Sequence, residues 1–95
     1  MIITLKDLKI TIATINELTN NPQKPWTRTG ERNVANVGNY HLSEACGGYA
    51  LYQMASAGGS VHDTLKTGHV PKRELYNAMQ ALIVGLRAIP QSPNK

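Results

Sequence analysis

The chain has 95 residues, 41% of them hydrophobic and 17% charged, a balance typical of a folded domain and not of a disordered tail. Its formal net charge of +4 favours anionic partners such as nucleotides, nucleic acid or an acidic protein surface. One cysteine excludes an intramolecular disulfide. The sequence has neither a signal-peptide core nor a run of roughly 20 apolar residues. We therefore expect one small domain, residues 1–95, that lies in the cytoplasm and not in a membrane.

Residues 4–19 have the apolar spacing of a first helix. Leucine and isoleucine recur at steps of three and four, which places them on one helical face: Leu5, Leu8, Ile12, Ile15 and Leu18. Thr4 and Asp7 have the three-residue spacing of a reciprocal N-terminal capping pair. Ile10 points away from this face, and we interpret it as a surface residue or as part of a contact in an oligomer.

The segment 20–33 is expected to be a loop. An Asn-Asn-Pro sequence at 20–22 ends the helix, because asparagine favours caps and proline cannot continue the hydrogen-bond ladder. The rest has no apolar period, but it holds the only tryptophan, Trp26, near three cations: Lys24, Arg28 and Arg32. An aromatic ring between cations suits a stacked base and paired phosphates. The alternative is a tryptophan that only pins its loop to the core.

Residues 34–65 show the alternation of short strands. Apolar or aromatic residues alternate with others around Tyr40, Tyr49 and Val61, and two Gly-Gly pairs, at 47–48 and 58–59, suit tight connections between these runs. The simplest arrangement is a three-stranded antiparallel meander. An alternative makes residues 49–57 a helix that ends at Gly58, because alanine, leucine, glutamine and methionine favour helix.

Residues 71–89 are the expected closing helix, followed by a frayed tail at 90–95. Gly68 and Pro71 mark the start of the helix. Its apolar positions recur at steps of four and three, with Tyr76 and Ile83 beside them: Leu75, Met79, Leu82, Leu86 and Ile89. We therefore predict an α+β fold, in which a three-stranded antiparallel sheet packs against an N-terminal and a C-terminal helix.

No motif in the sequence names a reaction. Cys46 lies five residues after His41, so the two would point to opposite faces of a strand, and we interpret Cys46 as a small buried residue before a turn. One cysteine and three scattered histidines lack the ligand spacing of a zinc site, and neither glycine pair matches a phosphate loop. We expect no catalytic residue, no metal and no cofactor. Acid–base catalysis by His41, His62 or His69 stays open as an alternative.

The cations at the start of the closing helix are the best candidates for a binding site. Lys72 and Arg73 lie where the helix dipole favours anions, and the free N–H groups of a helix start attract phosphate. Either solvent surrounds these cations, or an anion binds between them. If an anion binds, the expected ligand-binding residues are Trp26, Arg28, Arg32, Tyr49, Lys66, His69, Lys72 and Arg73.

Three short motifs follow one another in residues 40–86: Cys-Gly-Gly-Tyr-Ala-Leu at 46–51, Gly-Gly at 58–59 and Lys-Arg-Glu-Leu-Tyr at 72–76. Together they resemble a family of short phage and prophage accessory proteins of unassigned role. The resemblance implies a non-enzymatic counter-defence protein, either a sponge for a nucleotide signal or a protein that occludes a host protein or protein–RNA complex, as anti-CRISPR proteins do. Direct nucleic-acid binding is a further alternative.

We expect the first of these functions, capture of a small anionic ligand such as a nucleotide. A chain of this length has little room for a deep pocket of its own, and ligand pockets often form at interfaces. A homo-oligomer with sites between its chains is therefore part of the prediction.

Overall fold

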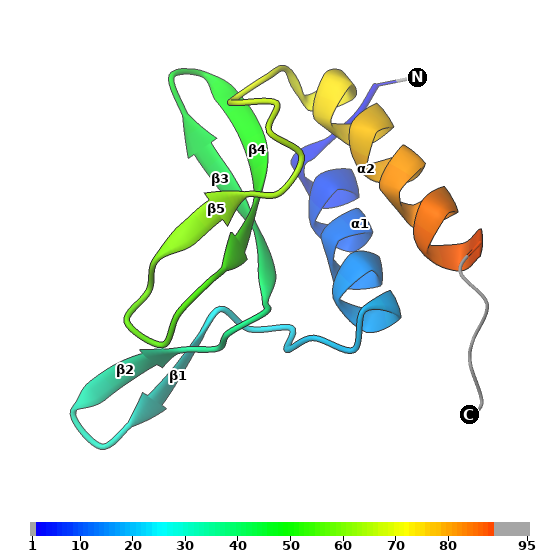
Figure 1. The fold of residues 1–95 in the computed structure, drawn as a ribbon. Coiled ribbons are helices and arrows are strands. Elements are labelled where there is room, and N and C mark those ends of the chain that lie inside the picture. Colours follow the sequence, from blue (N-terminus) through cyan, green and yellow to red (C-terminus); the bar gives the residue numbers. More distant parts are fainter. Residues whose placement is uncertain (1, 89–95) are drawn as a thin grey trace.

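The computed structural model describes residues 2–88, which form two helices and two antiparallel sheets (Figure 1). In chain order the elements are α1 (Leu5–Leu18), β1 (Trp26–Thr29), β2 (Arg32–Ala35), β3 (Tyr40–Ala45), β4 (Gly48–Met54), β5 (Val61–Asp63) and α2 (Lys72–Ala88). The predicted α+β class is confirmed. The expected role of Ile89 and the expected tail at 90–95 lie outside the described residues.

Helix α1 begins at the predicted capping pair. The backbone N–H of Thr4 donates to Oδ2 of Asp7 over 2.9 Å, and the backbone N–H of Asp7 donates to Oγ1 of Thr4 over 3.1 Å. These two bonds satisfy N–H groups that a helix start otherwise leaves unpaired. Ile10 is 56% exposed, as expected for a residue that points away from the buried face.

The three-stranded sheet is the predicted meander, with the order β3-β4-β5. β4 is its central strand, and its register pairs Leu42 with Leu51 on one side and Tyr52 with Asp63 on the other. The helical alternative for residues 49–57 is wrong. Pairing with a strand on each side outweighs the helix preference of the alanine, leucine, glutamine and methionine in this segment.

The turn between β3 and β4 is shifted by one residue from the expected Gly-Gly pair. Cys46 and Gly47 occupy it, with φ of 52° and 76°, and Gly48 is already paired with Ala45. A two-residue hairpin turn of type I′ needs positive φ at both central positions, so a cysteine takes a conformation that glycine or asparagine usually fills. Cys46 is exposed, and the expectation of a small buried residue is wrong.

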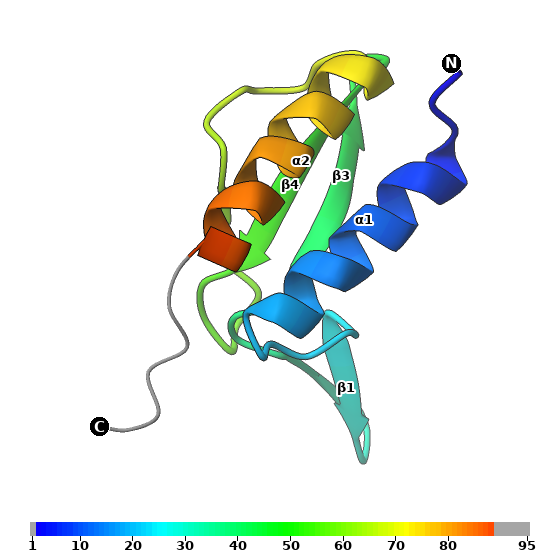
Figure 2. The same ribbon diagram turned by 90° about the vertical axis from the view of Figure 1, so that its right-hand side faces the viewer.

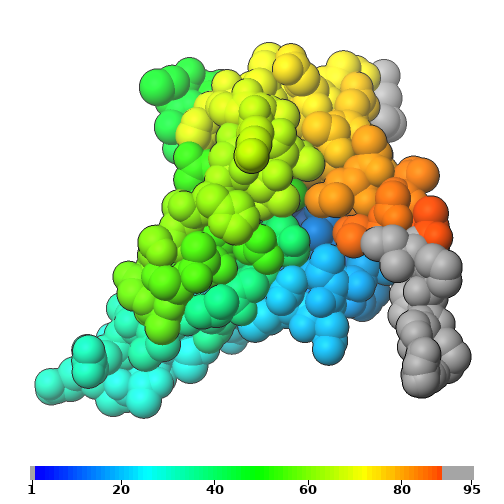
Figure 3. Space-filling model, in the orientation of Figure 1, coloured from blue at the N-terminus to red at the C-terminus, as the bar shows by residue number. Residues whose placement is uncertain are grey.

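The expected loop at 20–33 is also corrected, because β1 and β2 pair there as a hairpin with Trp26 opposite Ala35 and Thr29 opposite Arg32. The hairpin projects beyond the lower end of the three-stranded sheet, on the side away from the helices (Figures 1 and 3). Seven of its eight strand residues are exposed, all but Ala35. A strand pair with almost no buried side produces no apolar alternation in the sequence.

Both helices cover the same face of the three-stranded sheet (Figure 2). The core between the layers is built from eight buried apolar residues: Ile3, Leu8, Ile12, Ile15, Leu51, Leu75, Met79 and Ile83. In α2 the buried apolar residues are Leu75, Met79 and Ile83, although the sequence placed Ile83 only beside the apolar face. Leu82 and Leu86, which were predicted on that face, are only partly buried. We call the opposite face of the sheet, which points away from both helices, the open face.

Candidate functional site

The start of α2, residues 68–73, is held against the first residues of β4, and we call this segment the α2 entrance. The N–H of Tyr49 donates to the carbonyl of Val70 over 2.8 Å, and the N–H of Val70 donates to the carbonyl of Tyr49 over 3.0 Å. A Cβ on Gly48 would lie 2.7 Å from the carbonyl carbon of His69, so only glycine fits at that position. The α2 entrance is thus fixed to the sheet by backbone contacts.

Lys72 and Tyr49 are brought together on the helix side of the sheet. The Lys72 Nζ lies 5.7 Å from the centroid of the Tyr49 ring, a cation–π arrangement. The part of the chain that the structure describes gives this ammonium no carboxylate within ion-pair distance. Arg73 follows it at the exposed start of the helix. These residues form a small cationic surface with an aromatic base.

Lys66 lies in the connection that leads to the α2 entrance, with a φ of 55°. The Asp63 carboxylate orders this connection, because it accepts hydrogen bonds from the backbone N–H groups of Lys66 at 3.0 Å and Gly68 at 2.8 Å. The ammonium of Lys66 itself stays exposed to solvent. The Asp63 carboxylate therefore bonds to the backbone of this connection, and the Lys66 ammonium can contact an anion.

His69 is separated from Lys72 by the edge of the sheet. Its Nε2 lies 2.9 Å from the Ser43 Oγ, and its ring centroid lies 5.7 Å from that of Tyr52. Ser43 and Tyr52 point to the open face, because their strand neighbours Leu42 and Leu51 pack into the core. The group predicted from the sequence is therefore divided, with His69 on one face of the sheet and Lys72 on the other.

His41 joins His69 and Tyr52 on the open face. Its ring stands edge-on to Tyr52 at a centroid distance of 6.2 Å, and its Nδ1 lies 3.2 Å from Oδ1 of the buried Asn39. Burial lowers the pKa of His41, and hydrogen bonding to the backbone of Asn39 acts in the opposite direction. Sequence reasoning did not assign Ser43 or Tyr52 to a site, although their alternation with Leu42 and Leu51 was the available signal.

Trp26 and its cations lie at the other end of β4. Trp26 is 44% exposed, and it packs on Gly59, where a Cβ would lie 2.6 Å from a ring carbon. The Arg28 Nε donates to the carbonyl of Gly30 over 3.1 Å, and Arg32 is exposed. β4 has seven residues, so about 20 Å separates this cluster from the α2 entrance. The structure does not bring the two predicted cation groups together.

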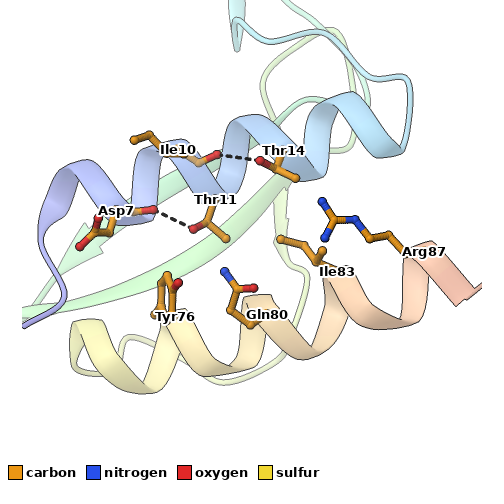
Figure 4. Close-up of a pocket in the computed structure, with 8 residues that line it drawn as sticks. All are labelled: Asp7, Ile10, Thr11, Thr14, Tyr76, Gln80, Ile83 and Arg87. Atoms are coloured by element: carbon orange, nitrogen blue, oxygen red, sulfur yellow. Dashed lines mark hydrogen bonds between the residues drawn. The ribbon is translucent and has the colours of Figure 1, made fainter. Parts of the chain in front are cut away.

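The α2 entrance lies apart from four hollows in the part of the chain that the structure describes. Lys66, His69, Lys72 and Arg73 line none of these four. The hollow in Figure 4 has a volume of about 220 Å³ and lies between α1 and α2, where Tyr76, Gln80 and Arg87 point toward α1. It is lined by Asp7, Ile10, Thr11, Thr14, Tyr76, Gln80, Ile83 and Arg87, and none of these was predicted to bind a ligand.

The residues considered for catalysis do not meet. Cys46 lies in the turn that follows β3, whereas His41 is near the other end of that strand, roughly 15 Å away at the usual rise per residue. His62 pairs with Gln53, so it alternates away from Tyr52 and the open face. Within residues 2–88, no three histidine, cysteine or acidic side chains gather as a metal site would require.

The chain matches no protein-family model, and it has no significant similarity to a curated protein or to a solved structure. Neither of the two helices described, α1 and α2, combines the length and the apolar character that a membrane crossing would need.

Proposed function

We propose that this protein is a non-enzymatic binding protein whose α2 entrance captures the phosphate of a nucleotide ligand. The observation that carries the proposal is the position of Lys72 over the Tyr49 ring, at a helix start and without a carboxylate partner in residues 2–88. The N-terminal end of a helix favours negative charge, so the Lys72 ammonium is unfavourable there until an anion is bound. A phosphate would relieve this unfavourable arrangement.

The resemblance to short phage accessory proteins extends the proposal to a biological role. A nucleotide sponge acting in the host cytoplasm would lower the concentration of a signal that host defence uses. Because Lys72 and Arg73 lie on an open surface, we propose that a second copy of the chain completes the site and shields the ligand from water. Tight capture of a small ligand needs such enclosure.

A thermal-shift panel of mono-, di- and cyclic nucleotides tests the proposal. A ligand that binds only the folded state raises the melting temperature with increasing concentration. We expect a shift with one nucleotide class in the unaltered protein and its loss in the Lys72→Ala/Arg73→Ala double variant. The matched control is Lys9→Ala/Arg87→Ala, which removes the same charge from exposed positions outside the site.

Two results would contradict the proposal. Equal shifts in both double variants would mean that net charge, and not the α2 entrance, attracts the ligand. Flat curves for every nucleotide would favour the alternative in which the protein occludes a host protein or a protein–RNA complex.

A further inference from the structure

The open face of the three-stranded sheet carries a row of aromatic rings that the proposed phosphate site does not use. His41 on β3, Tyr52 on β4 and His69 beyond the edge of β4 follow one another with centroid distances of 6.2 and 5.7 Å. Both helices lie on the other side of the sheet (Figure 2). The three rings are all partly exposed, so their surfaces are accessible to a ligand.

Hydrogen bonds hold the two histidine rings in place. Asn39 bonds to His41, and Ser43 bonds to His69 across the strand that carries Tyr52. Asn39 is fully buried and donates from its Nδ2 to the carbonyl of Pro22 over 2.7 Å, so its position is fixed in turn. A ligand that stacks on this row therefore orders few side chains, which lowers the entropic cost of binding.

Exposed cations lie beside this row and on the β1–β2 hairpin. Lys66 is bonded through its backbone to Asp63, the strand partner of Tyr52, and Arg28 and Arg32 lie on the hairpin beyond Met54. The acid that shares the open face is Asp63, the strand partner of Tyr52, and its carboxylate oxygens already accept backbone hydrogen bonds. An anionic chain that follows β4 toward Met54 would pass the aromatic rings and Lys66 and then meet the cations of the hairpin.

We propose that the open face binds a single strand of nucleic acid, whose bases stack on the row of His41, Tyr52 and His69 and whose phosphates reach Lys66 beside this row and the cations of the β1–β2 hairpin. This inference goes beyond the proposed function, because the open face lies opposite the α2 entrance, and it names a chain of nucleotides as a second ligand. A mononucleotide is too short to span a strand of about 20 Å. A duplex keeps its bases stacked on each other, so it cannot offer them to the rings.

The test compares binding of fluorescent oligothymidylate of about 12 nucleotides to the unaltered protein and to Tyr52→Leu and Tyr52→Phe variants. Leucine fills the position without an aromatic ring, and we expect affinity to fall roughly tenfold or more, as loss of one stacked base predicts. Phenylalanine keeps the ring and should bind like the unaltered protein. Equal affinity of the leucine variant, or equal affinity for the matching duplex, would overturn the inference.

Trp26 supplies a second readout that needs no substitution. It is the only tryptophan of the chain and lies at the hairpin end of β4. The long oligothymidylate should change its fluorescence in parallel with binding, whereas a thymidine dinucleotide held at the α2 entrance should leave it unchanged. Saturable binding of the long strand without any change at Trp26 would also overturn the inference.

The two proposals fail in different ways. If Lys72→Ala/Arg73→Ala abolishes nucleotide binding while Tyr52→Leu changes nothing for the long strand, the phosphate site stands and the open-face inference is wrong. If neither nucleotides nor the long strand bind the unaltered protein, both are wrong.

Discussion

Substitution of Gly48 by alanine tests how the α2 entrance is attached to the sheet. The new Cβ would lie 2.7 Å from the carbonyl carbon of His69, 2.8 Å from its oxygen and 2.9 Å from the nitrogen of Val70. All three are backbone atoms, so no side-chain rotation relieves the contact. The His69–Val70 backbone must then move away from β4.

That movement breaks the two hydrogen bonds, of 2.8 and 3.0 Å, that pair Tyr49 with Val70. Each contributes about 1 kcal/mol, and the overpacking itself costs about 1–3 kcal/mol. We therefore expect Gly48→Ala to lower the free energy of unfolding by about 3–5 kcal/mol, a large part of the stability of a small domain.

Urea denaturation followed by circular dichroism measures this loss. The matched control is Gly85→Ala in α2, because a Cβ on Gly85 meets no atom within 4 Å. Alanine at this helical position should raise the free energy of unfolding by about 0.5–1 kcal/mol. If Gly48→Ala unfolds at the same urea concentration as the unaltered protein, the close packing of His69 on β4 is refuted.

Three further substitutions test the framework around the site. Asn16→Ala removes both hydrogen bonds to the Tyr40 backbone, of 2.9 and 2.8 Å, and leaves buried groups unpaired. It should lower the free energy of unfolding, measured by urea denaturation, by about 2–3 kcal/mol, and a change near zero would contradict this. Thr4→Ala should cost about 1 kcal/mol in the same assay, while Thr4→Ser keeps the cap. Because burial lowers the pKa of His41 below its ordinary 6.5, stability should fall as the pH drops below 6.5; His41→Gln should flatten this dependence, and an unchanged pH profile would refute the assignment.

Local patterns in the sequence predicted the framework well. The Thr4 and Asp7 capping pair and the three-strand meander are present, and the predicted face of α1 is buried at Leu8, Ile12 and Ile15 but exposed at Leu5. Each depends on residues within one element or between strands adjacent in the chain. Such signals need no knowledge of how distant parts of the chain pack.

The site was predicted less well because its arrangement depends on long-range pairing. Val70 pairs with Tyr49, and this pairing carries the chain across the edge of the sheet between His69 and Lys72. Residues only three apart in the sequence therefore face opposite sides. No local pattern indicates where a connection of this kind crosses an edge.

The β1–β2 hairpin shows a second limit of the sequence. Its strands contact little of the core, so the apolar alternation that identifies β3 and β4 is absent from them. The position of Trp26 on Gly59 is a contact between residues far apart in the chain. It separates the tryptophan from the cations at the α2 entrance that the sequence analysis had grouped with it.

The most direct test of the central claim is a two-dimensional NMR titration of isotope-labelled protein with adenosine monophosphate. If the α2 entrance captures nucleotide phosphate, the largest amide shift changes will fall at Tyr49, at Val70 and at residues 72–74. They will disappear in the Lys72→Ala/Arg73→Ala variant and persist in Lys9→Ala/Arg87→Ala. Shift changes centred on the hollow between α1 and α2, or none at saturating nucleotide, would contradict the claim.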